Sequence, residues 1–237
     1  MSNNFFRFKQ FTVYQNERVL KVSTDSVLLG AWAPVGDYKK VLDVGTGSGL
    51  LALMMAQRFP KSEIDAVEID PESAAIAEKN FSQSLFSNRI KLFVTSIQKF
   101  SEKYSKNCYH LIISNPPYFE NQKPAASEGK NIQKHNKYLS FGELAAIVKL
   151  LLEEEGVFAL ILPPKEGKQF IATARFHGLY CIQMTEVFVR SKQTQSKRRL
   201  LLFSKVQQPV ITNKLFLEND KGSRSKEFQN LTLPFYL

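Results

Sequence analysis

The fold is decided by one stretch near the start of the chain, Val41-Leu42-Asp43-Val44-Gly45-Thr46-Gly47-Ser48-Gly49. A short apolar strand leads into three alternate glycines, and Leu50–Arg58 continues at helical spacing. Glycines at such a strand-to-helix turn let the backbone approach a ligand closely. A tight turn also needs glycine when no ligand is present, so the turn alone is weak evidence. Because Leu50 replaces the last glycine of the dinucleotide fingerprint GxGxxG, an NAD site is the weaker interpretation.

The same strand-and-helix unit repeats along the chain. Seven strands are predicted, at Val41–Val44, Ile64–Ile69, Ile90–Thr95, Leu111–Ile113, Val157–Leu162, Tyr180–Val189 and Leu200–Val206. Helices are predicted at Leu50–Arg58, Pro71–Asn80, Phe141–Leu152 and Lys165–His177. This alternation predicts a Rossmann-like α/β fold: a seven-stranded, mostly parallel sheet with helices on both faces and a C-terminal antiparallel hairpin at its edge.

We expect residues 1–237 to form a single domain. Residues 1–39 are predicted to be an N-terminal arm, with a short strand in Phe5–Tyr14, followed by a helix that Ser23-Thr24-Asp25-Ser26 caps. Residues 40–237 are expected to form the core of the domain, and the catalytic part if the chain is an enzyme. The polar segment Phe119–Lys137 has no periodicity and is predicted to be a loop beside the site.

Composition narrows the class of protein. Hydrophobic residues make up 43% of the chain and charged residues 23%, which is ordinary globular usage and excludes a wholly disordered chain. The longest apolar run, Val157–Leu162, is far shorter than the roughly 20 residues of a membrane span. Met1–Gln10 lacks the apolar stretch of a secretory signal, and Cys108 and Cys181 are not in CxxC spacing. We therefore expect a cytoplasmic protein with reduced thiols, no membrane partner and no required metal.

The net charge of +10 is concentrated in the last third of the chain. Residues 161–237 hold 13 basic and five acidic side chains, against 19 and 17 in residues 1–160. A basic excess favours a polyanionic partner such as nucleic acid, although a solvated basic face that only aids solubility is the alternative. The candidate contacts to such a partner in this region, RNA if the partner is RNA, are Arg190, Lys192, Lys197, Arg198 and Arg199.

An acidic residue follows the glycine turn at the end of the next strand. Glu68 lies 23 residues after Gly45, where a carboxylate can accept hydrogen bonds from both ribose hydroxyls of a nucleoside. Asp70, two residues later, is predicted to cap the following helix. The glycine turn and Glu68 together predict a ligand that contains a nucleoside.

The fourth strand ends in Asn115-Pro116-Pro117-Tyr118, a tetrapeptide with specific chemistry. Two consecutive prolines remove two N–H donors and leave carbonyls that can accept hydrogen bonds from an amine. Here the sequence resembles the class I S-adenosylmethionine-dependent methyltransferases that modify planar amino nitrogens, whose hallmark is (N/D)PP(Y/F). The resemblance implies that Asn115 and Pro116 orient the amine and that Tyr118 stacks on the flat substrate. It also implies S-adenosylmethionine as the cofactor.

Within that class, the chain is most similar to the bacterial valine tRNA methyltransferases that modify N6 of the adenine beside the anticodon. The likeness lies in residues 21–33 and in the ending Leu233-Pro234-Phe235-Tyr236-Leu237. Methylation of a protein glutamine or of an rRNA base amine is the alternative within the same class. A non-catalytic module that binds the cofactor and RNA is a third hypothesis, and the complete tetrapeptide argues against it. A monomer is favoured.

The resemblance implies roles for individual residues. The cofactor-binding positions are Lys21, Thr24, Asp25, Ser26, Asp43, Gly45, Gly47, Glu68, Ser96 and Asn115. Ser96 stands where related enzymes often carry an acid, so it can hydrogen-bond but supplies no carboxylate. His135 is a candidate RNA contact in the predicted loop, and a solvated loop position is its alternative.

Overall fold

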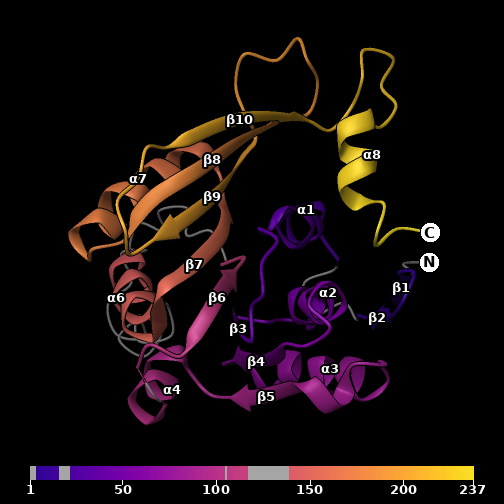
Figure 1. The fold of residues 1–237 in the computed structure, drawn as a ribbon. Helices are drawn as coiled ribbons and strands as arrows, with labels where there is room; N and C mark the ends of the chain where they lie inside the picture. The colour runs from indigo at the N-terminus through magenta and orange to yellow at the C-terminus, as the bar shows by residue number, and fades with distance from the viewer. Residues whose placement is uncertain (1–3, 16–21, 105, 117–138) are drawn as a thin grey trace, which may run out of the picture.

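The centre of the molecule is an eight-stranded sheet (Figure 1). The computed structural model describes residues 4–15, 22–104, 106–116 and 139–237. The strands of the sheet are β3 (Lys40–Val44), β4 (Glu63–Glu68), β5 (Ile90–Val94), β6 (Tyr109–Ser114), β7 (Leu152–Leu162), β8 (Tyr180–Phe188), β9 (Arg198–Ser204) and β10 (Ile211–Phe216). Their spatial order is β10-β8-β9-β7-β6-β3-β4-β5. Neighbours pair in parallel except at β9, which is antiparallel to both β7 and β8.

The predicted α/β class and mostly parallel sheet are confirmed, but the expected count of seven strands is wrong. β10 pairs in parallel with β8, from Ile211 opposite Gln183 to Phe216 opposite Phe188. The antiparallel pair β8–β9 therefore lies inside the sheet, and β10 forms the edge in its place. The first four residues of β10 are exposed, and its polar residues interrupt any apolar alternation. Periodicity of hydrophobic residues, which revealed the other strands, could not reveal this one.

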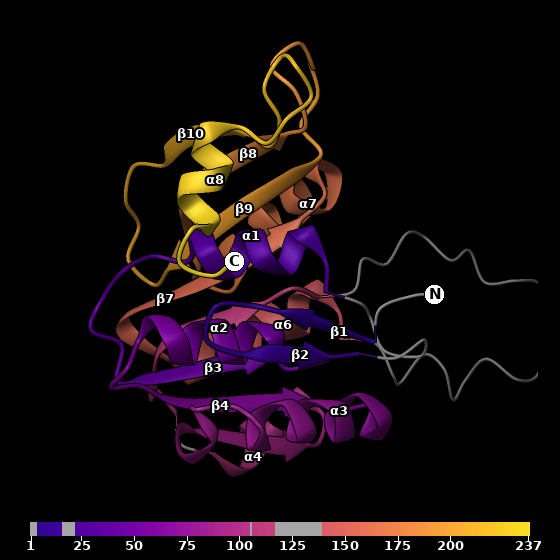
Figure 2. The ribbon, with the colours of Figure 1, turned by 90° about the vertical axis from the view of Figure 1, so that its right-hand side faces the viewer.

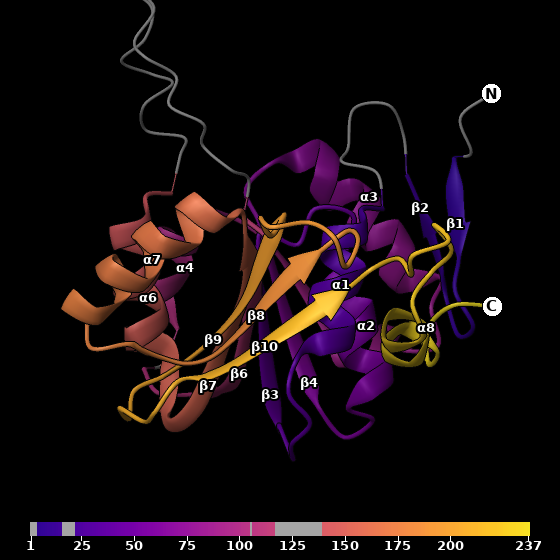
Figure 3. The ribbon, with the colours of Figure 1, turned by 90° about the horizontal axis from the view of Figure 1, so that it is seen from above.

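Helices cover both faces of the sheet (Figure 3). One face packs against α1 (Thr24–Trp32), α2 (Leu50–Arg58) and α3 (Pro71–Ser82), and the other against α4 (Ile97–Lys103), α6 (Phe141–Leu151) and α7 (Pro164–Phe176). Strand β6 shows why: Leu111 and Ile113 belong to the first apolar cluster and Ile112 to the second. A strand that is apolar on both sides needs a helical layer on each side. Among the described helices, none is long and apolar enough to span a membrane.

Several helix boundaries were predicted correctly from neighbouring residues in the sequence. Ser23 and Asp70 are N-caps, with side chains that accept hydrogen bonds from the backbone N–H groups of Ser26 and Ser73. Helix α2 has the predicted bounds. These boundaries were readable because an N-cap acts over three residues and needs no distant partner.

The junction between α6 and β7 differs from the prediction. The helix ends at Leu151 and the strand begins at the next residue, five residues earlier than expected. Gly156, which precedes the predicted start of the strand, lies inside it. A Cβ atom there would lie 2.8 Å from the carbonyl oxygen of Tyr109, next to a register shift in β6. The glycine therefore permits the close approach of the neighbouring strand.

The two ends of the chain pack together on the α2 side of the sheet (Figure 1). Strands β1 (Phe5–Arg7) and β2 (Thr12–Tyr14) form a separate antiparallel pair, and α8 (Lys226–Thr232) precedes the C-terminal residues. Phe8 stacks on Tyr236 with ring centroids 6.0 Å apart. The backbone N–H of Lys9 donates to the carbonyl of Phe235 at 2.8 Å. Within the predicted N-terminal arm, residues 4–15 thus form a hairpin that the C-terminal residues cover.

Candidate active site

The predicted site residues gather at one edge of the sheet. Strands β3, β4, β5 and β6 are mutually parallel, so their carboxyl ends lie at the same edge. The order of the strands changes direction at β3. Strands β4 and β5 lie on one side of it, and β6 and β7 lie on the other. In open α/β sheets, ligands bind in the crevice beyond the carboxyl ends at such a switch point. The segments there are 45–49, 69–70, 95–96 and 115–116.

The glycine turn between β3 and α2 presents open backbone to this crevice. Gly45, Gly47 and Gly49 have φ angles of 72°, 56° and 85°. A Cβ atom at Gly45 or Gly47 would meet no atom within 4 Å, whereas at Gly49 it would lie 2.5 Å from the ring of Phe81. The third glycine therefore permits packing of α3, and the first two leave space for a ligand to lie against the backbone.

Glu68 is held against this turn. Its Oε2 accepts a hydrogen bond from the backbone N–H of Gly47 at 2.8 Å, and its Oε1 accepts one from Asp70 at 2.9 Å. The side chain is buried, with 8% of the residue exposed. A carboxylate offers about four lone-pair positions, so two positions remain beyond these backbone bonds. This arrangement fits a ribose diol.

Asp43 lies at the base of the turn and is fully buried. Its Oδ2 accepts hydrogen bonds from Thr46 Oγ1 at 2.6 Å and from the backbone N–H of Ala52 at 3.1 Å. Among the described residues, its Oδ1 has no hydrogen-bond partner. Burial raises the pKa of this carboxyl to about 7, the two hydrogen bonds oppose the rise, and the charge of Glu68 adds to it. An orphaned buried oxygen is suited to a donor or a cation that enters with a ligand.

Asn115 follows β6 and is fixed in orientation by α1. Its Nδ2 donates to Ser26 Oγ at 2.9 Å, and Ser26 Oγ lies 3.1 Å from Ser23 Oγ, the N-cap of the helix. This bond uses the nitrogen of the amide group and does not involve its oxygen, Oδ1. One residue earlier, the hydroxyl of Ser114 donates to the carbonyl of Val44 at 2.8 Å, which ties β6 to β3 beside the glycine turn. Asn115 and Pro116 are both half-buried.

The first turn of α1 has a second connection. Arg198, at the start of β9, donates from Nε to Asp25 Oδ2 at 2.6 Å. Thus Asp25 pairs with Arg198, a predicted RNA contact, and the next residue, Ser26, accepts a hydrogen bond from Asn115, a predicted catalytic residue. Thr24 is exposed at the same end of the helix.

Ser96 lies at the same edge but has a structural role. It is the N-cap of α4, where its Oγ accepts from the backbone N–H of Lys99 at 3.2 Å. The preceding residue, Thr95, donates its N–H to the carbonyl of Glu68 at 2.9 Å. Ser96 is therefore close to the predicted ribose site, with its hydroxyl engaged by the helix.

The predicted basic contacts divide into two groups. Three arginines have carboxylate partners: Arg190 pairs with Glu218 at 2.7 Å, Arg198 with Asp25 and Arg199 with Glu186 at 3.0 Å. Lys192 and Lys197 are exposed in the connection between β8 and β9. The other predicted site residues, Lys21, Pro117, Tyr118 and His135, lie outside the described residues.

Asn80 supports the glycine turn and was not anticipated. Its Nδ2 donates to the carbonyls of Ser48 and Tyr14 at 2.8 and 3.0 Å, and its Oδ1 accepts from the N–H of Tyr14 at 2.8 Å. It thereby joins the turn, α3 and the N-terminal hairpin. The available signal was a polar residue on the buried stripe of a helix, since Ala77 and Phe81 are its buried neighbours.

Comparison with known proteins identifies the class. The methyltransferase small domain family matches residues 16–160. A solved structure of a predicted O-methyltransferase from Agrobacterium tumefaciens superposes with a TM-score of 0.70 at 18% identity, over 89% of this chain and 96% of that one. The Pyrococcus horikoshii protein TYW2, solved in complex with MeSAdo, superposes with a TM-score of 0.60 at 13% identity, over 85% of this chain and 71% of that one. The chain therefore belongs to the methyltransferase small domain family and has the fold of these methyltransferases.

More similar proteins define the family. A Trichodesmium erythraeum protein named tRNA1(Val) (adenine(37)-N6)-methyltransferase is 40% identical over 100% of this chain and 99% of its own length. The Photorhabdus laumondii protein of the same name is 38% identical over 98% of this chain and 95% of its own length. This chain belongs to the tRNA1(Val) (adenine(37)-N6)-methyltransferase family.

Proposed function

We propose that this chain transfers a methyl group from S-adenosylmethionine to the exocyclic N6 amine of an adenine in tRNA, the adenine beside the anticodon of valine tRNA. Membership of the family supports the reaction and the substrate. The observation that carries the mechanism is the hydrogen bond of 2.9 Å from Asn115 Nδ2 to Ser26 Oγ, at the edge that also holds Gly45 and Glu68.

The proposed role of this bond is to orient the amide. With Nδ2 engaged by Ser26, the oxygen of Asn115 is the atom that accepts a hydrogen from the substrate amine, and the Pro116 carbonyl accepts the other. The lone pair of an exocyclic amine is delocalised into its ring, so it is a poor nucleophile. Pinning both hydrogens directs that lone pair out of the ring plane. Positioning of this kind is worth several orders of magnitude in rate.

S-adenosylmethionine, when bound, supplies an electrophilic methyl carbon on a sulfonium centre. We propose that Glu68 binds its ribose, that Gly45 and Gly47 line it, and that the orphaned oxygen of Asp43 faces its polar groups. Thr24, Asp25, Ser26 and Ser96 border this site, together with Lys21. In the same proposal Pro117 shapes the turn and Tyr118 stacks on the adenine; stacking of this kind contributes about 1–3 kcal/mol for a base.

The RNA is proposed to lie along the carboxyl edge of the sheet, with His135 and the basic residues of the last third beside it. We further propose that the chain acts in the cytoplasm as a monomer and requires no metal ion. Among the described residues, no group of three His, Cys, Asp or Glu side chains could hold a metal.

The test is direct. The protein is incubated with labelled S-adenosylmethionine and total tRNA that lacks the modification, and the methylated nucleoside is identified by digestion and mass spectrometry. We expect N6-methyladenosine from valine tRNA. Asn115→Ala should lower turnover by about two orders of magnitude or more and leave cofactor affinity within a few-fold, because it removes the acceptor for the substrate amine and leaves Glu68 and the glycine turn in place.

Asn213→Ala is the matched control for this substitution. It changes an exposed asparagine on β10 and should leave turnover unchanged. Full activity of Asn115→Ala would discard the amine-orienting mechanism. Label in a guanine would replace the proposed substrate, and so would label in a protein glutamine when a protein extract takes the place of tRNA in the same incubation.

A further inference from the structure

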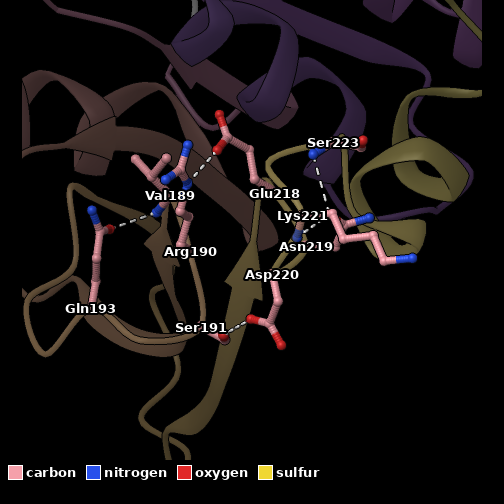
Figure 4. Close-up of polar contacts among 9 residues, drawn as sticks. All are labelled: Val189, Arg190, Ser191, Gln193, Glu218, Asn219, Asp220, Lys221 and Ser223. Carbon is pink, nitrogen blue, oxygen red and sulfur yellow. Dashed lines mark hydrogen bonds and ion pairs between the residues drawn. The ribbon is translucent and has the colours of Figure 1, made fainter.

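Two connections at the carboxyl edge of the sheet are joined into one body. They are the connection from β8 to β9, residues 189–197, and the connection from β10 to α8, residues 217–225, and we call the pair the two-loop lobe. It projects beyond the sheet (Figure 2). The backbone N–H of Glu218 donates to the carbonyl of Val189 at 2.8 Å. Side chains add the Arg190–Glu218 pair at 2.7 Å and a hydrogen bond from Ser191 to Asp220 (Figure 4).

Each loop is also braced from within. In the first loop, the side-chain oxygen of Gln193 accepts from the backbone N–H of Val189 at 2.9 Å. In the second, Asn219 Oδ1 accepts from the N–H groups of Lys221 and Ser223 at 2.9 and 3.1 Å (Figure 4). Because these bonds order the loops before any ligand arrives, docking on them loses little conformational entropy.

The lobe carries an excess of positive charge on its outside. Its charged residues are Arg190, Lys192, Lys197, Lys221 and Arg224 against Glu218 and Asp220, a net charge of +3. Lys192, Lys197 and Lys221 are exposed, and within the described part of the chain none of them forms an ion pair. Lys192 and Lys197 also border a shallow hollow of about 250 Å³.

The lobe lies on the same edge as the candidate active site. β8 and β10 run parallel to each other, and β8 runs in the same direction as β7 because each is antiparallel to β9. The residue that follows the first loop, Arg198, binds Asp25, and the next residue of α1, Ser26, binds Asn115. Two consecutive side chains of one helix therefore join the base of the lobe to the catalytic amide.

We propose that the two-loop lobe docks the phosphate backbone of the RNA substrate outside the methylated nucleotide, with Lys192, Lys197 and Lys221 as its phosphate contacts. The Arg190–Glu218 pair holds the two loops together and does not contact RNA. This inference rests on the proposed function, because RNA is the occupant. Cationic side chains on a preformed surface are the ordinary means of binding phosphates without reading sequence.

The first experiment removes the lysines. We would measure the affinity of the full chain for tRNA across a series of NaCl concentrations, with the triple variant Lys192→Ala, Lys197→Ala and Lys221→Ala. Affinity should fall at least tenfold near physiological salt. The slope of log affinity against log salt should decrease by about 2–3, because each lost phosphate contact removes about 0.7–0.9. Three arginines at these positions should restore binding.

The matched control removes three exposed lysines at the opposite edge, Lys39, Lys61 and Lys106, with the same change in net charge. It should retain near wild-type affinity. Equal affinities of the two triple variants would overturn the lobe proposal even when wild-type protein methylates tRNA. Absence of tRNA methylation by wild-type protein, with the lobe effect on binding intact, would instead remove the proposed function.

A second experiment tests whether Arg190 braces the two loops or contacts phosphate. The two roles predict opposite changes in the tRNA affinity of Glu218→Ala. If Arg190 is a brace, Arg190→Ala and Glu218→Ala should each weaken tRNA binding several-fold, and the double variant should match the single ones. If Arg190 contacts phosphate, Glu218→Ala should strengthen binding, because it releases the guanidinium. Stronger binding by Glu218→Ala would therefore contradict the proposed brace.

Discussion

Replacing Glu68 by glutamine keeps the length and shape of the side chain and removes its charge. The carboxylate now accepts one backbone hydrogen bond on each oxygen, from Gly47 and Asp70. Glutamine has one acceptor oxygen, so its amide nitrogen must face one of these two N–H groups. The proposed ribose diol would lose one acceptor entirely, and its remaining bond would be to a neutral oxygen.

The loss follows from these contacts. Hydrogen bonds to charged groups contribute about 1.5–3 kcal/mol and neutral ones about 1 kcal/mol. Exchanging two charge-assisted bonds for one neutral bond should cost about 2–5 kcal/mol of cofactor binding, which raises the Kd by roughly 30- to 4,000-fold. The unpaired backbone N–H should also lower Tm by a few degrees, at roughly 2–4 °C per kcal/mol for a chain of this size.

Titration calorimetry with S-adenosylmethionine measures the Kd, and thermal unfolding without ligand reports the folded state. Glu63→Gln is the matched control, because Glu63 is exposed at the opposite end of the same strand. It should change neither quantity. A Kd for Glu68→Gln within twofold of wild type would remove Glu68 from the ribose site.

Three further predictions follow from the polar contacts. Ser26→Ala should lower kcat about three- to tenfold, because Asn115 loses its 2.9 Å bond, and Ser26→Thr should restore it; equal kcat for Ser26→Ala and wild type would contradict the orienting role. Since burial raises the pKa of Asp43 from 3.8 to about 7, the folded chain holds a proton there that the unfolded chain releases. Stability should therefore fall as pH rises from about 4 to 7, and Asp43→Asn should flatten that part of the Tm profile; an unchanged profile would refute this cause. Tyr109→Phe should cost about 1–2 kcal/mol of unfolding free energy in urea titrations, because its hydroxyl donates to buried Asp65 at 2.6 Å, and an unchanged midpoint would show that bond to contribute nothing.

The glycine turn and its surroundings could be predicted because their physics is local. Alternate glycines after an apolar strand specify a turn with positive φ, and the observed angles at Gly45, Gly47 and Gly49 agree. Parallel strands then place Glu68 and Asn115 at one edge without further information. Each of these predictions depended only on a short stretch of three or four neighbouring residues.

The ion pairs could not be predicted because their partners are distant in sequence. Arg198 is 173 residues from Asp25, and Arg190 is 28 residues from Glu218. Counting basic residues assigned all of them to the RNA, whereas three of the five arginines and lysines at the predicted positions have carboxylate partners. The short helices α4 and α8 were missed for a related reason, since seven residues form a helix only when tertiary packing stabilises it.

The first turn of α1 shows how one polar cluster can serve several functions. Ser23, Asp25 and Ser26 were expected to cap a helix and border a cofactor, and each is engaged in a different direction: the helix N-terminus, Arg198 and Asn115. Because Asp25 and Ser26 are consecutive residues of α1, contacts run from Arg198 through these two residues to Asn115. The start of α1 therefore joins the base of the proposed docking surface to the proposed site by direct side-chain contacts.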